Sequence, residues 1–296
     1  DPSLSWYSTV QTASETATVT GVRLADLDEA TWQAIYAAWL EHALLVFPGQ
    51  FLSNAQQIGF AKRFGPIEQI GGGDIVAISN VKPDGTVRSH TPAEWDDMMK
   101  VIVGNMAWHA DSTYMPVMSK GAVFSGEVVA TTGGETSFAD MRAAYDALDE
   151  PTRALVHQRS AHHSLRYSQS KLGHHHNPNS AYVGYGMDQT AAPLRPLVKV
   201  HPETGRKSLL IGRHAHAIPG MTPEASEQFL EGLVEWACQP PRVHTHHWTA
   251  GDVVLWDNRC LLHRAMPWEM SQPRVMWHSR LRGDEVAELA AASAAA

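Results

Sequence analysis

Residues 252–265 read DVVLWDNRCLLHRA, and this stretch indicates the class of fold. Its first part, Asp252 to Trp256, is mostly apolar and predicts a buried strand. Further strands are predicted on either side of it, at Val243 to Trp248 and at Arg274 to Leu281. Because strands dominate the second half of the chain, we expect a mainly β core, a sandwich or barrel, with helices packed outside it.

Both kinds of element are predicted in the rest of the chain. Strands are predicted at Thr16 to Leu24, Ala43 to Phe47, Ile75 to Ser79 and Ala122 to Val129. Helices are predicted at Asp28 to Glu41, Asp140 to Leu148 and Pro151 to Arg159, and after the cap residues Ser53, with Gln56 as its capping-box partner, and Thr222. The last helix should bury Phe229, Leu230, Leu233 and Trp236. Residues 71–97 are expected to form an ordered but mobile loop.

Composition excludes several classes of protein. Lys and Arg total 23 against 31 Asp and Glu, a net charge of −8 that disfavours nucleic acid as a partner. No apolar run approaches the roughly 20 residues of a membrane span. Two cysteines, Cys238 and Cys260, are too few for a disulfide framework, and no signal peptide is visible, so we expect a reduced, cytoplasmic protein. A single domain over residues 1–296 is predicted, with its core at 16–281, a fraying tail at 290–296 and a homo-oligomeric state.

Two segments together suggest a metal site. His109 and Asp111 are two residues apart, and on a strand such residues point to the same side. His263, in the opening stretch, could supply a third ligand from far along the chain. Two histidines and one carboxylate form the facial triad of non-haem Fe(II) oxygenases. Zinc in a hydrolase would accept the same ligands, so the ligand set alone does not decide the chemistry.

Arg274, at the start of the next predicted strand, favours iron. A keto acid that chelates the metal through one end can carry a second carboxylate at the other. A guanidinium binds such a carboxylate through two hydrogen bonds. Thr136, in the stretch GGETSF at residues 133–138, could add a hydroxyl donor.

With these residues in place, the sequence resembles a known family. The elements His109-x-Asp111, Gly133-Gly134-x-Thr136, WDNRxxxH at 256–263 and Arg274 look like the taurine dioxygenase and 2,4-dichlorophenoxyacetate dioxygenase group. The resemblance spans about residues 16–281. Within the group, residues 108–117, 138–145 and 211–217 look most like the aryloxyalkanoate dioxygenases of the (S)-phenoxypropionate type.

The resemblance implies a double-stranded β-helix (jelly roll) with flanking helices. His109, Asp111 and His263 would bind Fe(II), while Thr136, Arg274 and Asn105 would lie at the cosubstrate 2-oxoglutarate. With O2 as the oxidant, the enzyme would hydroxylate the carbon next to the ether oxygen of a small-molecule aryloxyalkanoate. A phenol and a keto or aldehyde acid would leave, with succinate and CO2.

The substrate contacts depart from the family pattern. Where taurine-type relatives place a second arginine for the substrate anion, this chain has His278, and Arg280 lies two residues further on the same predicted strand face. Arg280 is therefore the first choice for the substrate carboxylate. Arg213 and His214 are the second choice for the carboxylate. The other residues assigned to the substrate are Val76 and Ile78, for the ring, and Ser112.

Other functions stay open from the sequence. The same oxygenase chemistry could act on a sulfonate or another small organic anion. A zinc-dependent hydrolase would use the same three ligands but would have no need of Arg274. A jelly-roll binding protein without catalysis is a further alternative.

Overall fold

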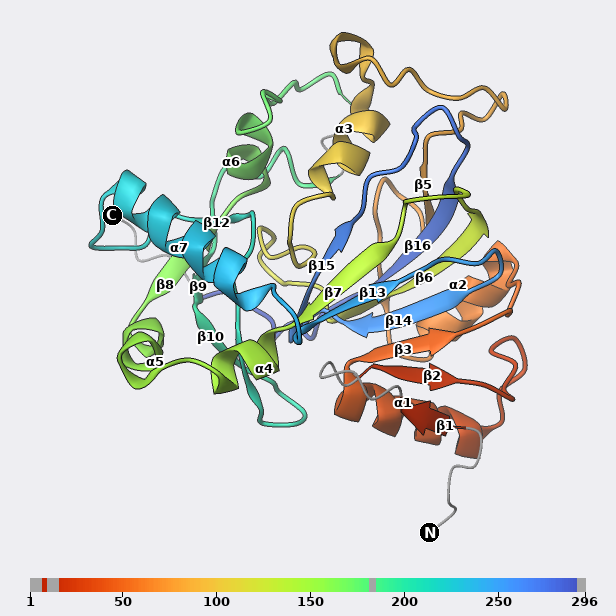
Figure 1. Cartoon of the computed structure of the whole chain (residues 1–296), viewed down its shortest axis with the longest axis horizontal. Coiled ribbons are helices and arrows are strands. Elements are labelled where there is room, and N and C mark those ends of the chain that lie inside the picture. The colour runs from red at the N-terminus through yellow and green to blue at the C-terminus, as the bar shows by residue number, and fades with distance from the viewer. Residues whose placement is uncertain (1–6, 10–15, 181–184, 292–296) are drawn as a thin grey trace.

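The computed structural model describes residues 7–9, 16–180 and 185–291. Two β-sheets lie at its centre, with helices around them (Figure 1). Trp256 of one sheet and Phe138 of the other pack between the sheets, with their ring centroids 5.6 Å apart. The protein is a jelly roll (double-stranded β-helix) with flanking helices, so the mainly β class predicted from the sequence is confirmed.

The larger sheet has the strand order β1-β2-β3-β14-β6-β16-β4, and β5 also pairs with β16. Its strands are β1 Tyr7–Thr9, β2 Ala17–Val19, β3 Leu44–Phe47, β4 Ile67–Glu68, β5 Val76–Ser79, β6 Gly121–Val128, β14 Val253–Asp257 and β16 Val275–Leu281. β14 lies between β3 and β6, so both of its edges are paired. Val253 and Leu255 pack in the cluster with α1, and Val254 and Trp256 in the cluster with Phe138 of the smaller sheet, so both faces of the strand are buried. The strand predicted from the opening stretch is thus a central strand of this sheet.

The smaller sheet has the order β13-β7-β15 and carries part of the functional site. Its strands are β7 Thr136–Asp140, β13 Val243–His246 and β15 Leu261–Ala265. Two peripheral sheets, β12-β8-β9 and β10-β11, consist of β8 Ser160–His163, β9 Leu194–Pro196, β10 Val198–Val200, β11 Lys207–Leu209 and β12 Ala215–His216. His263 pairs with Phe138 across β15 and β7, which directs both side chains toward the space between the two central sheets.

Helices cover both central sheets. They are α1 Glu29–His42, α2 Asn54–Lys62, α3 Asp97–Gly104, α4 Met141–Asp146, α5 Glu150–His157, α6 Leu165–Ser170 and α7 Pro223–Ala237, with a short 3-10 turn η1 at Pro92–Glu94. Trp32, Ile35 and Trp39 of α1 pack into the same apolar cluster as Leu45 and Leu255 of the larger sheet. α7 packs its buried face near the smaller sheet. Among the described helices, none is long and apolar enough to cross a membrane.

The predicted helix caps are confirmed in detail. The Asp28 carboxylate accepts a hydrogen bond from the backbone N–H of Thr31 and begins α1. Ser53 and Gln56 form the complete capping box of α2. The Thr222 hydroxyl accepts from Ala225 at the start of α7. Short-range hydrogen bonds of this kind depend only on neighbouring residues, and for this reason the sequence predicts them well.

Other predictions need correction. The strand expected at Thr16 to Leu24 is confined to β2, and Trp236 is 39% exposed rather than buried, because it stacks against the Arg242 guanidinium on the outside of α7. The tail was expected to fray, but its described residues pair with the rest of the chain: Ala290 donates a backbone hydrogen bond to Pro116, and Ala291 pairs with Leu194. The rest of the predicted tail, 292–296, lies outside the described residues.

Asp257, in the stretch 252–265, has a structural role and does not bind a ligand. Its carboxylate accepts hydrogen bonds from the Arg259 guanidinium at 2.8 and 2.9 Å and lies 2.8 Å from His201 Nε2, and all three residues are buried. Arg259 also contacts Glu203 and stacks on the Trp39 ring. This buried network fixes the turn between β14 and β15, and with it the strand that carries His263.

Replacing Asp257 with asparagine should destabilise the protein. The substitution keeps the shape but leaves the buried Arg259 without a full counter-charge, which costs about 1–3 kcal/mol of unfolding free energy. Urea denaturation would measure the loss. As a control, Asp84→Asn, in an exposed turn, should leave the unfolding free energy unchanged. Equal stability of the two variants would contradict the role given to Asp257.

Candidate functional site

Two histidines are placed side by side by a backbone pairing. His109 N–H donates to the His263 carbonyl at 3.0 Å, and His263 N–H donates back to His109 at 2.8 Å. In such a pair the two side chains lie on the same face, and here their ring centroids are 4.2 Å apart. His109 thus comes from the loop after α3, and His263 from β15, although they are distant in sequence.

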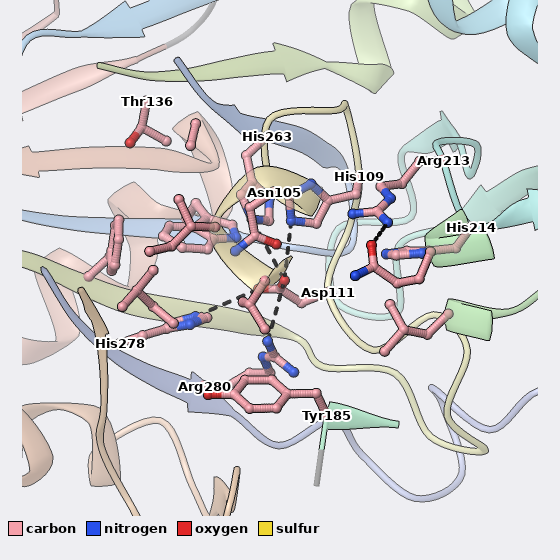
Figure 2. A pocket seen from close by; sticks show the side chains of 18 of the residues that line it. Asn105, His109, Asp111, Thr136, Tyr185, Arg213, His214, His263, His278 and Arg280 are labelled. Atoms are coloured by element: carbon pink, nitrogen blue, oxygen red, sulfur yellow. Dashed lines mark hydrogen bonds and ion pairs between the residues drawn. The ribbon is translucent and has the colours of Figure 1, made fainter. Parts of the chain in front are cut away.

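Asp111 completes the cluster from a turn, so it reaches the same side as His109 by a bend of the chain and not by the alternation of a strand. Ser112 has a positive φ of 57°, which bends the chain directly after Asp111. The Asn258 side chain accepts a hydrogen bond from Asp111 N–H and donates one to its carbonyl, so the turn is fixed from the far side. The carboxylate still points toward the two imidazoles: Asp111 Oδ1 lies 3.7 Å from Nε2 of both His109 and His263 (Figure 2).

The three side chains fit a divalent metal ion. One ligand atom from each lies within 4.8 Å of the others, and all three residues are buried. His109 Nδ1 donates to the Ala107 carbonyl at 2.7 Å, which leaves Nε2 as a lone-pair donor for a metal. Asp111 Oδ2 is buried with no hydrogen-bond partner among the described residues. Within the described part of the chain, no other group of three such side chains meets this distance limit.

The protonation states also suit a metal. Burial lowers the pKa of His109 and of His263 below the usual value, so both rings are neutral near pH 7. Burial alone would raise the pKa of Asp111, but the neighbouring Arg280 and the surrounding histidines bring it below its usual range. Two neutral imidazoles and one carboxylate are the forms that bind metal without first losing a proton.

Arg274 presents a buried positive charge to the same cavity. Burial lowers the pKa of Arg274 to about 10, and no carboxylate of the described residues lies within ion-pair distance. The guanidinium stacks on Trp268 and donates to the Gly134 carbonyl at 3.0 Å. Gly134 has a φ of +73°, and a Cβ there would lie 3.2 Å from Arg274 Nε, so the glycine makes this close approach possible. Such a charge is suited to an anionic ligand.

Thr136 and Asn105 line the cavity with Arg274. The Thr136 hydroxyl accepts a hydrogen bond from Trp248 Nε1 at 2.9 Å and still has its own proton to donate. Asn105 caps the end of α3, and its carbonyl accepts from Ala265, so β15 and α3 are joined beside the metal-binding triad. All three residues assigned to the cosubstrate are therefore brought together.

Arg280 lies in the cavity but already contacts two carboxylates. Its Nη2 is 3.5 Å from Asp111 Oδ1, its Nε is 3.9 Å from Glu68 Oε2, and its Nη1 donates to the Ser112 hydroxyl at 3.0 Å. Burial would lower the pKa of Arg280, but Asp111 and Glu68 raise it above the usual value. His278 faces the other Asp111 oxygen at 3.6 Å. Arg280 is thus a buried link between Asp111 and Glu68.

Only some of the remaining residues assigned to the substrate line the cavity. Arg213, His214 and Ile78 line the cavity. Arg213 donates to the Gln169 side chain, and His214 Nδ1 lies 2.8 Å from the Ser168 hydroxyl. Val76 does not line the cavity but packs near it in the central apolar cluster. Ser112 lies behind Asp111, between Arg280 and Glu68.

Sequence reasoning missed several residues of the site. Glu68 stands opposite Arg280 in the register of β4 and β16, so the two charges meet by strand pairing. The cavity wall also includes residues that no motif pointed to: Val101, Ile102, Phe124, Leu165, Gln169 and Trp268. An alternating strand pattern is a weak signal on a two-residue strand such as β4, so a single sequence offers little to find Glu68.

Comparisons with known proteins agree with this geometry. The family model described as "Taurine catabolism dioxygenase TauD, TfdA family" matches residues 8–280. A (S)-phenoxypropionate/alpha-ketoglutarate-dioxygenase of Delftia acidovorans is 78% identical over 93% of this chain and 94% of its own, and one of Sphingobium herbicidovorans is 62% identical over the same shares. The crystal structure of AAD-2 in complex with Mn(II) and N-oxalylglycine has a TM-score of 0.85 and 34% identity, covering 95% of this chain and 99% of that one. Since the match extends over nearly the whole chain, the protein belongs to the TauD, TfdA family of dioxygenases.

Proposed function

We propose that this protein is an Fe(II)- and 2-oxoglutarate-dependent dioxygenase that cleaves aryloxyalkanoates of the phenoxypropionate type. The names of the two relatives at 78% and 62% identity support this substrate class. The observation that carries the proposal is the meeting, in one buried cavity, of the His109, Asp111 and His263 ligand atoms with the unpaired guanidinium of Arg274. A zinc hydrolase would need the three ligand atoms but not the Arg274 guanidinium.

The assigned roles follow from these contacts. His109, Asp111 and His263 would hold the iron, and Arg274 would bind the far carboxylate of 2-oxoglutarate, with Thr136 and Asn105 beside it. Iron bound there, with 2-oxoglutarate and O2, supplies the oxidising power that inserts an oxygen atom into a C–H bond. One oxygen atom enters the substrate and the other enters succinate, with loss of CO2. For a 2-phenoxypropionate, the hydroxylated carbon then releases the phenol and becomes the keto carbon of pyruvate.

The protein's own part is to position the substrate. Holding the carboxylate fixes the neighbouring carbon, which carries the hydrogen to be replaced, relative to the metal-binding triad. Arg280 stays the first choice for this contact, with Arg213 and His214 the second. Asp111 would share its charge with a bound cation, which leaves Arg280 facing Glu68 and able to accept a further anion. The ring would lie against apolar wall residues such as Ile78 and Phe124.

Arg280→Ala should separate the two anion contacts. We expect the KM for phenoxypropionate to rise about tenfold to a hundredfold, because a charged hydrogen bond contributes about 1.5–3 kcal/mol. The KM for 2-oxoglutarate should change by less than about threefold, since Arg274 remains. Steady-state kinetics with each substrate varied in turn would measure both, with Arg282→Ala, at an exposed position, as the matched control.

Mn(II) affinity would be measured on the same Arg280 variant, because its side chain also contacts Asp111. A variant that loses 2-oxoglutarate binding but keeps its phenoxypropionate KM would reverse the assignment of Arg274 and Arg280.

A substrate panel tests the proposed function. Succinate formation from 2-oxoglutarate would be followed with Fe(II) and O2 in the presence of each enantiomer of 2-phenoxypropionate, phenoxyacetate or taurine. The proposal predicts that a phenoxypropionate stimulates succinate formation most. Stimulation by taurine alone would favour the alternative, an oxygenase of small sulfonates, and no stimulation by any aryloxyalkanoate would refute the proposed substrate class.

The cytoplasmic location and the homo-oligomeric state stay predictions from the sequence. Both cysteines, Cys238 and Cys260, are buried free thiols, as suits a reducing compartment. Light scattering coupled to size-exclusion chromatography would give the number of chains in the assembly.

A further inference from the structure

A second cavity lies on the opposite face of the smaller sheet from the metal-binding triad. It has a volume of about 730 Å³, is partly open to solvent, and is lined by the sheet and by helices α6 and α7, which Figure 1 places on that side of the molecule. Thr245, Ser137 and Arg264 form one row across β13, β7 and β15 and line the cavity. Because side chains alternate along a strand, the His263 side chain points to the side of the other triad residues, and the Arg264 side chain points to this cavity.

Arg264 carries a charge that nothing in the described structure balances. Its guanidinium lies 4.6 Å from the centre of the Trp108 ring. Its Nε is buried without a hydrogen-bond partner, and among the described residues no ion pair or hydrogen bond engages this side chain. A buried donor left unsatisfied in this way costs free energy, which a ligand with an acceptor group would recover.

The other charged residues of the cavity wall are Arg213, Lys171, Glu227, Glu231 and Glu235. Glu235 is exposed, and Arg213 donates a hydrogen bond to the Gln169 side chain. On the helix side, Lys171 contacts both Glu227 and Glu231, whose side chains are 43% and 64% exposed. Exposed pairs of this kind are screened by water and contribute little field inside a cavity. Arg264 is therefore the charge best placed to attract an anion.

The remaining wall is largely apolar and includes Trp108, Leu230, Val234 and Val243. The volume falls within the roughly 300–1,000 Å³ that small-molecule sites occupy. An apolar wall with one unpaired guanidinium suits a ligand that has a carboxylate at one end and a ring at the other. A flat ring would also pack well against the Trp108 indole.

We propose that this cavity is a second binding site, and that its ligand is an aromatic monocarboxylate. The carboxylate pairs with Arg264, and the ring lies among Trp108, Leu230, Val234 and Val243. The proposed catalytic cavity lies on the other face of the same sheet, and Arg213 lines both cavities.

The position of this second site couples it to the metal ligands. Arg264 directly follows His263, and Trp108 directly precedes His109, the two residues that the backbone pairing joins. A ligand that orders Arg264 and Trp108 thereby acts on the segments that hold both imidazoles. Because coupling between two sites is reciprocal, phenylacetate and Mn(II) should change each other's affinity by the same factor.

Calorimetry with phenylacetate tests the proposal on the full chain loaded with Mn(II) and 2-oxoglutarate under anaerobic conditions. We expect Arg264→Gln to lower the number of phenylacetate molecules bound by one per chain. Val234→Trp, which fills the cavity from α7, should do the same while leaving Arg264 in place. Arg242→Gln is the matched control, because Arg242 stacks on Trp236 at 4.7 Å in a similar way but does not line the cavity.

Three outcomes of this calorimetry decide whether the second cavity binds phenylacetate. Loss of one binding site in both cavity variants, with the control unchanged, supports the proposal. Wild-type stoichiometry in both cavity variants overturns it. A change in oligomeric size without any change in phenylacetate binding also overturns it, since the cavity would then be a contact between copies of the chain. The measurement does not use turnover, so its failure would leave the proposed reaction untouched.

Discussion

Replacing Asp111 with alanine should reduce turnover of phenoxypropionate to background. The substitution removes the only carboxylate of the metal-binding triad and leaves two imidazoles, which bind a divalent cation weakly. Changing a residue that only supports a metal ligand typically lowers metal affinity or activity by about 10- to 100-fold. The loss on removing Asp111, a proposed ligand itself, should be larger. Phenol release in a discontinuous assay would measure activity, and Mn(II) titration would measure binding. His109→Ala and His263→Ala should behave alike.

The fold should survive the Asp111 change, because Asn258 holds the surrounding turn through backbone atoms that alanine keeps. Thermal unfolding checks this point. Asp252→Asn serves as a matched control, since Asp252 is also buried beside a histidine, His246, but lies outside the metal-binding triad. If Asp111→Ala kept near-normal ether cleavage while Mn(II) binding was unchanged, the triad assignment would be wrong.

Arg274→Ala should raise the KM for 2-oxoglutarate by about 30-fold to several thousand-fold. Truncating one partner of a buried charged pair costs about 2–5 kcal/mol, and each 1.4 kcal/mol corresponds to a factor of ten. Arg274→Lys keeps the charge but loses the two-pronged contact, so it should lie between alanine and the wild type. Initial rates with 2-oxoglutarate varied at saturating phenoxypropionate would give these values.

Thr136 provides the comparison for Arg274. Thr136→Ala should cost only about 0.5–1.5 kcal/mol in 2-oxoglutarate affinity, because a neutral hydrogen bond is lost. Thr136→Ser retains the hydroxyl and the bond from Trp248, and should be close to the wild type. Equal and small effects at Arg274 and Thr136 would mean that the keto acid binds elsewhere.

The site residues that could be predicted from the sequence belong to local patterns. His109 and Asp111 are two apart, and His263 and Arg274 are joined to predicted strands. The structure brings all four to one cavity. The local conformation was less predictable: the turn at Asp111 depends on the positive φ of Ser112, which nothing in the residue types requires.

Contacts that depend on long-range pairing could not be predicted. Glu68 meets Arg280 only because β4 pairs with β16, which lies more than 200 residues later in the chain. Arg280 lies on the same strand face as Arg274, as expected, but the sequence did not indicate its two carboxylate neighbours, Asp111 and Glu68. α3 was also missed, although Asp96 caps it by accepting from Met99, because its apolar residues come as a run rather than a clear helical spacing.

The stoichiometry of phenol release distinguishes a 2-oxoglutarate-dependent oxygenase from a hydrolase. Purified protein with Fe(II), 2-oxoglutarate and 2-phenoxypropionate would be assayed with and without O2, and with Zn(II) in place of Fe(II). We expect one succinate and one pyruvate for each phenol, and no phenol when O2, 2-oxoglutarate or Fe(II) is omitted. Phenol released without O2 or 2-oxoglutarate, or released with Zn(II) alone, would contradict this expectation and favour a hydrolase.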